Sequence, residues 1–247
     1  MAEIENIFEF RSFGKIARLS REVIVTEKID GTNAQILIVK SSERMERVRK
    51  GGISPVAIFH GDSEDPEAVD VYAGSRNRWL TCENDNFGFA GWVARNAEEL
   101  KKLGVGRHYG EWWGQGIQRN YGLKEKRFSL FNRSRWASVT QDPIVPGVFM
   151  TPDANGLLPA EQKFQHVGCC HVVPTIWRGD FDTQDIDRFI EMLNIEGSFA
   201  APGFKNPEGL VVYHTAANRF FKKTCVGDEK RKSDVRNPSG DFNRVAQ

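Results

Sequence analysis

The sequence predicts a single α+β domain in which antiparallel sheets are flanked by helices. Four apolar runs have the composition of β-strands, at 23–25, 34–39, 207–213 and 219–224. Two segments have the apolar spacing of an amphipathic helix, at 86–103 and 183–193. No repeat or low-complexity linker interrupts the 247 residues, so we expect one domain over the whole chain.

Turn and cap residues support each of these elements. Asp30-Gly31 predicts a tight turn between the first two strands, because glycine adopts backbone angles that other residues avoid. A short polar turn joins the last two strands. Asp85 or Asn86 can cap the first helix and Gly104 can end it. Shorter apolar runs at 56–59 and 127–132 predict two further strands.

Composition is that of an ordinary globular protein, with 40% apolar and 27% charged residues and a net charge of +1. The charge is locally uneven: residues 117–136 contain six basic and one acidic residue, and 219–236 contain seven basic and three acidic. Such stretches can form a phosphate-facing groove or a solvated face. No apolar run approaches the roughly 20 residues needed to span a membrane.

The four cysteines lack the two-residue spacing of zinc and redox motifs, and no signal peptide precedes them. We therefore expect a reducing, cytoplasmic setting. His166, Cys169, Cys170 and His171 lie close together in the sequence, where buried structural residues are favoured over a metal site.

The run EKIDGTN at 27–33 places Lys28 beside the first predicted turn. A lysine is protonated at neutral pH and cannot attack as a cation, but nearby positive charges and partial burial favour the neutral, nucleophilic amine. Glu208 opens the third strand, and Lys222 and Lys223 lie in the fourth. Lys28 is either a nucleophile approached by these groups or a surface lysine beside a turn.

A glycine-rich run, GEWWGQGIQRN at 110–120, predicts backbone brought close to another group. It lacks the spacing and the Lys-Ser/Thr of a Walker loop.

Together these segments resemble the covalent nucleotidyltransferases, which include polynucleotide ligases and mRNA capping enzymes. The likeness narrows to the RNA ligase 2 type found in phages. It covers the chain from about the twenties to about residue 232, and three runs carry it: EKIDGTN at 27–33, GEWWGQGIQRN at 110–120 and RFSLFN at 127–132. The resemblance implies a nucleotidyltransferase domain with a central ATP cleft.

The resemblance also implies a role for each matching residue. Lys28 would attack the α-phosphate of ATP and form a lysyl-adenylate, with Glu27 and Asp30 beside it. Ile29 and Asn33 would belong to the cofactor-binding segment, and Asn33 would lie near the reacting phosphate or its metal-bound water.

Further roles fall on residues outside this motif. Arg76 would contact the ribose and later the nucleic acid, Glu111 the ribose hydroxyls, and Phe131 the adenine ring. Glu208 would engage a divalent metal, Mg²⁺ or Mn²⁺. Lys222 and Lys223 would neutralise the phosphates; the family's usual Lys-x-Lys is here Lys-Lys, which leaves open which lysine reaches which phosphate.

The implied function is ATP-dependent RNA ligation, in which AMP passes from the lysine to a 5′-phosphate that is then sealed to a 3′-OH. The partner would be broken or nicked RNA. A DNA ligase is the alternative, because Asp30 is shared with DNA ligases where the RNA ligase 2 type often has His. A non-catalytic nucleic-acid-binding protein and a capping guanylyltransferase are less favoured. The family's separate C-terminal domain is expected to be missing, 233–247 to be a mobile tail, and the protein to be a monomer.

Overall fold

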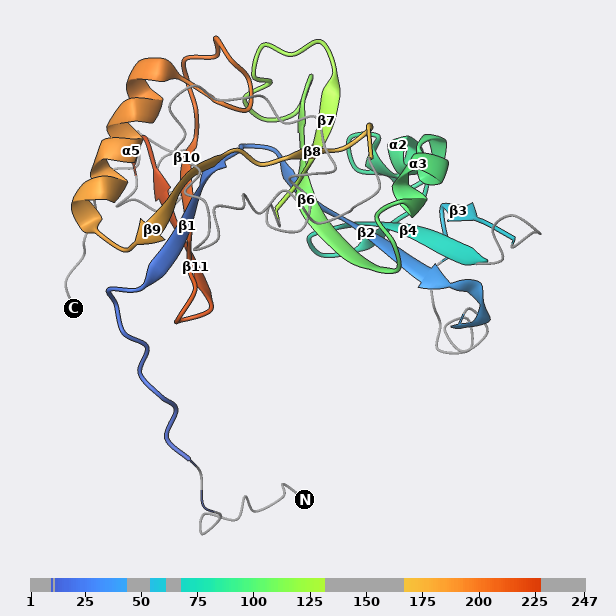
Figure 1. Cartoon of the computed structure of the whole chain (residues 1–247). Coiled ribbons are helices and arrows are strands. Elements are labelled where there is room, and N and C mark those ends of the chain that lie inside the picture. The colour runs from blue at the N-terminus through green and yellow to red at the C-terminus, as the bar shows by residue number, and fades with distance from the viewer. Residues whose placement is uncertain (1–9, 11, 44–53, 61–67, 132–166, 228–247) are drawn as a thin grey trace, which may run out of the picture.

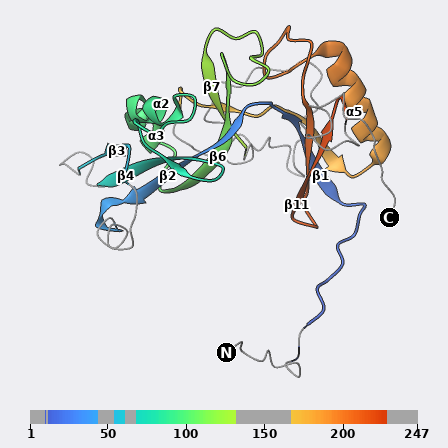
Figure 2. The same cartoon turned by 180° about the vertical axis from the view of Figure 1, so that it is seen from behind.

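The computed structural model of the chain describes residues 10, 12–43, 54–60, 68–131 and 167–227. Its strands form a four-stranded and a seven-stranded sheet. Figures 1 and 2 show α5 at one end of the molecule, against the four-stranded sheet, and α2 with α3 at the other end. The predicted α+β class is confirmed. Among the described residues, no helix is long and apolar enough to cross a membrane.

The four-stranded sheet is antiparallel throughout, in the order β11-β10-β1-β9. Its strands are β1 (Glu22–Lys28), β9 (Thr175–Asp180), β10 (Gly209–His214) and β11 (Arg219–Thr224). Alternate residues of β1 and β10 point toward α5 (Thr183–Glu196) and form a buried cluster with its apolar side. Asp182 caps α5 by accepting a hydrogen bond from the Gln184 N–H at 2.7 Å. The second predicted helix is thus confirmed, three residues longer than expected.

The seven-stranded sheet follows the order β3-β4-β2-β6-β7-β8, with β5 paired to β4. Its strands are β2 (Thr32–Lys40), β3 (Ala57–Ile58), β4 (Val69–Ser75), β5 (Trp79–Leu80), β6 (Gly106–Gly114), β7 (Lys126–Leu130) and β8 (His171–Val172), and the short 3-10 helix η1 (Ser41–Glu43) follows β2. All pairs are antiparallel except β7 with β8, which is parallel. Because β7 ends at Leu130 and β8 begins only at His171, the direction of β8 could not be inferred from local sequence.

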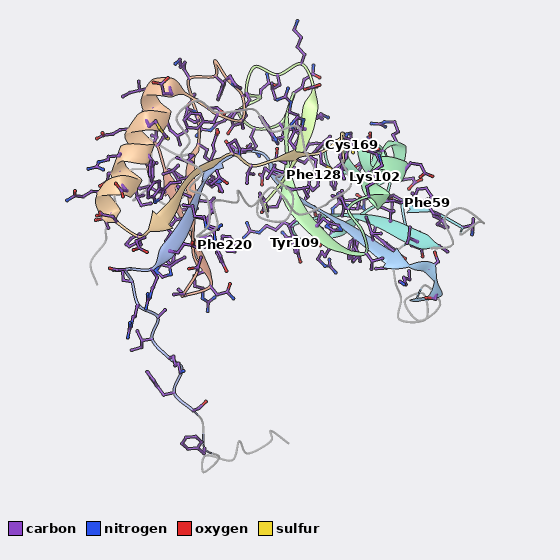
Figure 3. All side chains as sticks on the ribbon, in the orientation of Figure 1. Phe59, Lys102, Tyr109, Phe128, Cys169 and Phe220 are labelled. Carbon is purple, nitrogen blue, oxygen red and sulfur yellow. The ribbon has the colours of Figure 1, made fainter. Side chains whose placement is uncertain are left out.

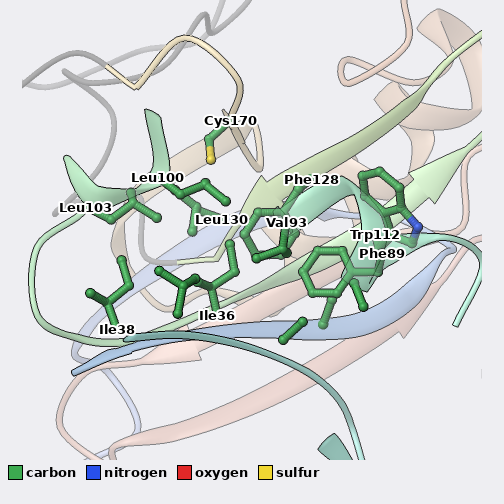
Figure 4. Packing of buried hydrophobic residues seen from close by; sticks show 14 of the residues in the cluster. Ile36, Ile38, Phe89, Val93, Leu100, Leu103, Trp112, Phe128, Leu130 and Cys170 are labelled. Atoms are coloured by element: carbon green, nitrogen blue, oxygen red, sulfur yellow. The ribbon is translucent and has the colours of Figure 1, made fainter. Parts of the chain in front are cut away.

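The main core lies between the seven-stranded sheet and two short helices, α2 (Phe89–Arg95) and α3 (Ala97–Lys101). Figure 4 shows the helix side chains Phe89, Val93 and Leu100 packed over Ile36 and other residues of the sheet. The sequence predicted one continuous helix here. The helical path instead breaks at Asn96, whose side-chain amide donates to the carbonyl of the preceding turn at 2.8 Å.

The predicted turn at Asp30-Gly31 lies between β1 and β2, but the two strands do not pair with each other, because they belong to different sheets. Residues 29–31 carry the chain from one sheet to the other. Gly31 is required there by close approach, since a Cβ atom would lie 2.5 Å from the carbonyl oxygen of Trp112 and 2.7 Å from the Cβ of Trp113. His166, Asn132 and the predicted tail at 233–247 lie outside the described residues.

Candidate active site at the junction of the two sheets

Lys28 and Glu208 meet where the two sheets join. Lys28 ends β1 and pairs with Gly209, the first residue of β10. The Lys28 Nζ donates to the Glu208 Oε2 at 2.5 Å, across 180 residues of sequence. The Glu208 side chain is only 4% exposed, whereas the Lys28 side chain is 21% exposed, so the lysine is the more accessible member of the pair.

Strand geometry brings Glu208 to this position. Gly209 has a φ of +151°, and a Cβ atom there would lie 2.1 Å from the backbone oxygen of Lys223 on β11. Only glycine therefore lets β10 begin this close to its neighbour. The Glu-Gly pair predicted from the sequence thus has a steric reason, since the glycine sets the backbone beside Lys28 and the carboxylate precedes it.

The two predicted lysines of β11 lie on opposite faces of the four-stranded sheet. Lys222 pairs with Val211, which is opposite Thr26, so Lys222 shares the face of Lys28. It is exposed and forms no ion pair with any described residue. Lys223 points to the other face and forms an ion pair with Asp187 of α5. The structure therefore brings Lys222, and not Lys223, to the face of Lys28.

Glu27 also points away from Lys28, because adjacent strand residues face opposite sides. Its buried carboxylate accepts hydrogen bonds from the Ser198 hydroxyl at 2.6 Å and from the Phe199 and Ala200 N–H groups at 2.8 Å. Burial raises the pKa of Glu27 to about 7, although these three donors lower it. The structure thus places Glu27 on the face of β1 opposite Lys28, where its carboxylate binds the loop that follows α5.

Glu111 lies on β6 directly opposite Asn33 of β2. Its carboxylate accepts hydrogen bonds from the Asn33 side-chain amide at 2.9 Å and from the Gly31 N–H at 3.1 Å. Burial raises the pKa of the Glu111 carboxyl to about 7, against the lowering effects of the Lys28 charge and of these two donors. Since Lys28 acts electrostatically on Glu111, the two predicted site residues belong to one local environment.

Phe131 and Arg76 lie at strand ends of the seven-stranded sheet. The Phe131 N–H continues the β7 ladder by donating to the Tyr109 carbonyl at 3.0 Å. Strand alternation puts Phe131 on the same face as Ser129, the partner of Glu111, and its ring is 41% exposed. Arg76 follows β4 in a turn, is exposed, and forms no side-chain hydrogen bond with the described residues.

Sequence reasoning missed the residues that hold the 29–31 segment in place. The Arg119 Nε donates to the Asp30 Oδ2 at 3.1 Å, and its terminal nitrogen donates to the Asn206 side-chain oxygen at 2.7 Å. The buried Tyr121 hydroxyl accepts from the Asp30 N–H at 2.7 Å, and Ile29 packs in the same cluster. The sequence signal for this contact is Arg119 itself, a basic residue within the glycine-rich run at 110–120.

The cysteines and His171 form no metal centre in the described part of the chain. All four cysteines are free, and no group of three or more His, Cys, Asp or Glu side chains among the described residues could hold a metal ion.

A family model described as RNA ligase matches residues 21–225, from just before β1 to just after β11. The chain belongs to the RNA ligase family. The match includes both sheets and every site residue described above. No curated protein matched the chain.

Solved RNA ligases from Naegleria gruberi are similar to this family member. An arginine-to-alanine variant with ATP and manganese is 18% identical, with a TM-score of 0.48, over 84% of this chain and 51% of that chain. A lysine-to-methionine variant with AMP and manganese is also 18% identical, with a TM-score of 0.46, over 83% of this chain and 50% of that chain. The chain thus spans about half the length of the solved RNA ligases that it matches.

Proposed function

We propose that this chain carries out ATP-dependent RNA ligation through a lysyl-adenylate on Lys28. The observation that carries the proposal is the 2.5 Å contact between Lys28 and Glu208 at the start of the Glu-Gly strand. A lysine and a carboxylate that are 180 residues apart meet at the junction of two sheets, with Lys222 on the same face. Family membership supports this assignment over a surface lysine beside a turn.

The first step transfers AMP to the lysine. The neutral Lys28 amine attacks the α-phosphorus of ATP, a nitrogen–phosphorus bond forms, the bond to the bridging oxygen of pyrophosphate breaks, and the amine loses its second proton to solvent. Before attack the ammonium must lose a proton, because its nitrogen otherwise has no lone pair. Glu208 holds the amine in place through their hydrogen bond, and Asp30 is held beside it by Arg119.

The remaining site residues bind and orient ATP in this proposal. Lys222 neutralises phosphate charge that develops in the transition state. Glu111 receives the ribose hydroxyls, Phe131 stacks on adenine, and Arg76 contacts the ribose and then the nucleic acid. Asn33 lies near the reacting phosphate. We assign Glu27 and Lys223 to supporting contacts, because both side chains point to the face that packs against α5 and its following loop.

A divalent metal that is bound mainly by the phosphates of ATP fits this site. Mg²⁺ keeps several waters and is held by one or two carboxylates together with substrate phosphates, so it needs no protein cage. Glu208 is the carboxylate placed to hold Mg²⁺ or Mn²⁺ here. When bound, the ion supplies positive charge that stabilises the phosphates during transfer.

AMP then passes from Lys28 to the 5′-phosphate of a broken strand, and a 3′-OH displaces AMP to seal the break. In the first transfer a phosphorus–oxygen bond forms as the phosphorus–nitrogen bond to Lys28 breaks. In the second, a phosphorus–oxygen bond to the 3′-OH forms as the bond to AMP breaks, and no further cofactor is needed. A DNA ligase would use the same chemistry. Sealing assays on nicked duplexes with ribose or deoxyribose on each side of the break distinguish the two, and preferential sealing of DNA ends would contradict the RNA assignment.

Adenylation itself is tested by intact mass after incubation with ATP and Mg²⁺. We expect the wild type to gain one AMP, and Lys28→Ala to gain none because the nucleophile is absent. Lys102→Ala is a matched control: this exposed lysine follows α3 and pairs with Glu99, so its loss leaves adenylation unchanged. A wild type without added AMP, or an equal gain on Lys28→Ala, would refute the proposal.

A further inference from the structure

The face of the four-stranded sheet that is turned away from α5 carries an aromatic pair, one partly buried ring and one exposed ring. The rings of Tyr213 on β10 and Phe220 on β11 lie 4.7 Å apart between centroids at an interplanar angle of 35°. Phe220 is 71% exposed and is labelled at this edge of the sheet in Figure 3. Strand register places Ile24 of β1 and Arg178 of β9 in line with this pair. Residues that are paired in this way across neighbouring strands form one row of the sheet. An aliphatic side chain and two aromatic rings thus lie side by side, next to an arginine that forms an ion pair with Glu22 at 3.0 Å.

The rows of this face lead from the aromatic pair to the nucleophile. The next row contains Thr26, Val211 and Lys222, and the one after it contains Lys28 and Gly209. Four residues of strand separate the aromatic row from the Lys28 row, about 13 Å at the usual rise of a β-strand. That is roughly four nucleotide steps at the stacked rise of about 3.4 Å per nucleotide. A strand with its end at Lys28 could therefore reach the aromatic pair.

The chemistry of the face fits unpaired nucleotides. Proteins bind single strands by combining aromatic rings, on which bases stack, with cations that follow the backbone. Here the rings are Tyr213 and Phe220, and the adjacent exposed cation is Lys222, which forms no ion pair with the described residues. The Tyr213 hydroxyl donates to the Asn218 side chain at 2.8 Å, which holds the ring in place before any ligand binds.

We propose that Tyr213, Phe220 and Lys222 form a binding site for the unpaired bases of an RNA strand whose end is being joined at Lys28. This inference rests on the proposed function for the identity of the ligand. It adds a stacking subsite of Tyr213 and Phe220 on β10 and β11, next to Lys222, which the proposed function already assigns to phosphate charge. The site would retain single-stranded ends through base stacking and a phosphate contact.

Phe221 provides a matched control. It neighbours Phe220 on β11 and is 57% exposed, but it pairs with Val212 and therefore lies on the opposite face, toward α5. Removing either ring deletes the same atoms from the same exposed edge strand. Only Phe220 belongs to the row that leads to Lys28, so the two variants separate a specific stacking site from general loss of apolar surface.

The test measures fluorescence anisotropy of a labelled, short single-stranded RNA on titration with the full chain, without ATP. We expect Phe220→Ala to weaken binding about 5-fold to 150-fold, the range that corresponds to losing one base stack. Phe220→Trp should restore affinity, and Phe221→Ala should bind as the wild type does. Thermal unfolding of each variant verifies that it is folded. Wild-type affinity in Phe220→Ala, or an equal loss in Phe221→Ala, would overturn the proposal.

The same RNA annealed to its complement provides the second arm. Bases inside a duplex are already stacked and cannot stack on Phe220, so the loss in Phe220→Ala should be smaller for the duplex. Equal losses on both RNAs would contradict base stacking, as would a Phe220→Ala effect confined to self-association of the protein. Because this assay contains no ATP, its result is independent of whether Lys28 becomes adenylated, and failure of one proposal is distinguishable from failure of the other.

Discussion

Glu27 and Lys28 are sequence neighbours, yet they lie on opposite faces of β1 and meet different surroundings. Lys28 contacts Glu208 at the junction of the sheets, where the lysine side chain remains partly exposed. The Glu27 carboxylate is buried and accepts three hydrogen bonds from residues 198–200. Burial nevertheless raises the pKa of Glu27 to about 7 from an ordinary value of 4.5. The proton is therefore held more tightly in the folded state than in the unfolded chain.

This raised pKa makes stability depend on pH. The stabilisation from Glu27 is fully present below about pH 4.5 and is lost as the pH rises through about 7. Glu27→Gln cannot titrate, but its amide oxygen can accept from Phe199 and Ala200 while its NH₂ donates to the Ser198 hydroxyl. Between pH 4.5 and pH 8, we expect the wild type to lose up to about 3 kcal/mol of unfolding free energy relative to Glu27→Gln, at about 1.4 kcal/mol per pKa unit.

Urea unfolding of both proteins at the two pH values measures this difference. Burial also raises the pKa of Glu111, but Glu111 is present in both proteins and its effect cancels. Identical pH dependence in the wild type and in Glu27→Gln would show that Glu27 does not titrate in this range.

At the scale of elements, the segment after β6 joins the two halves of the site. Arg119 in this segment contacts Asp30, close to Lys28, and also Asn206, two residues before Glu208. A single guanidinium thus links the Lys28 turn to the start of β10. Its planar fork of donors suits this bridging role better than the single ammonium of a lysine would.

Arg119→Ala should slow adenylation because the Lys28 turn and the Glu208 segment lose their common partner. We expect a single-turnover rate at saturating ATP that is lower by roughly 10-fold to 100-fold, the range for misplacing reacting groups by about 1 Å. Arg188→Ala is the control, since Arg188 forms an exposed ion pair with Asp185 within α5. If Arg119 only stabilised the fold, its removal would lower the melting temperature while the rate at saturating ATP stayed at the wild-type value.

At the scale of the molecule, each sheet has its own core, and a third buried cluster joins them. That cluster contains Ile29, Trp113, Tyr121, Val173, Ala200 and Ala201. The chain crosses between the sheets here twice, at 29–31 and at 173–174. The Val173 N–H donates to Leu130 in one sheet at 3.0 Å, and the Pro174 carbonyl accepts from the Glu27 N–H in the other at 2.9 Å. The relative position of the two sheets, and hence the site, depends on this cluster.

Two valine truncations separate the joining cluster from an ordinary core. Val173→Ala and Val23→Ala each remove two methyl groups from a buried position, one in the joining cluster and one in the α5 core. Both should lose about 1.5 kcal/mol of unfolding free energy. Only Val173→Ala should also slow adenylation when both are assayed fully folded. Equal adenylation rates in the two variants would mean that the joining cluster does not position the site.

Local sequence was sufficient to predict those helices and strands whose apolar spacing and end residues lie within the element itself. The helix at 183–193 and the strands at 207–213 and 219–224 were predicted because apolar spacing and end residues agreed. The break in the helix at Asn96 was not predicted, because the apolar spacing continues across it. The turn at Asp30-Gly31 did not reveal that β1 and β2 belong to different sheets, because a turn signal marks where a strand ends, whereas the hydrogen-bonding partner of the next strand is set by distant segments.

The sequence by itself determined the family, the candidate nucleophile Lys28 and the Glu-Gly pair at 208–209, because each is carried by residue types in a short, ordered motif. Tertiary structure alone decided that Lys222 shares the face of Lys28 while Lys223 and Glu27 point away, and that Arg119 links the two halves of the site. The physical reason is that the face of a strand residue depends on strand register and on where α5 packs. Both are set by contacts between segments up to about 180 residues apart, as in the Lys28–Glu208 pair, and are not encoded in any one stretch.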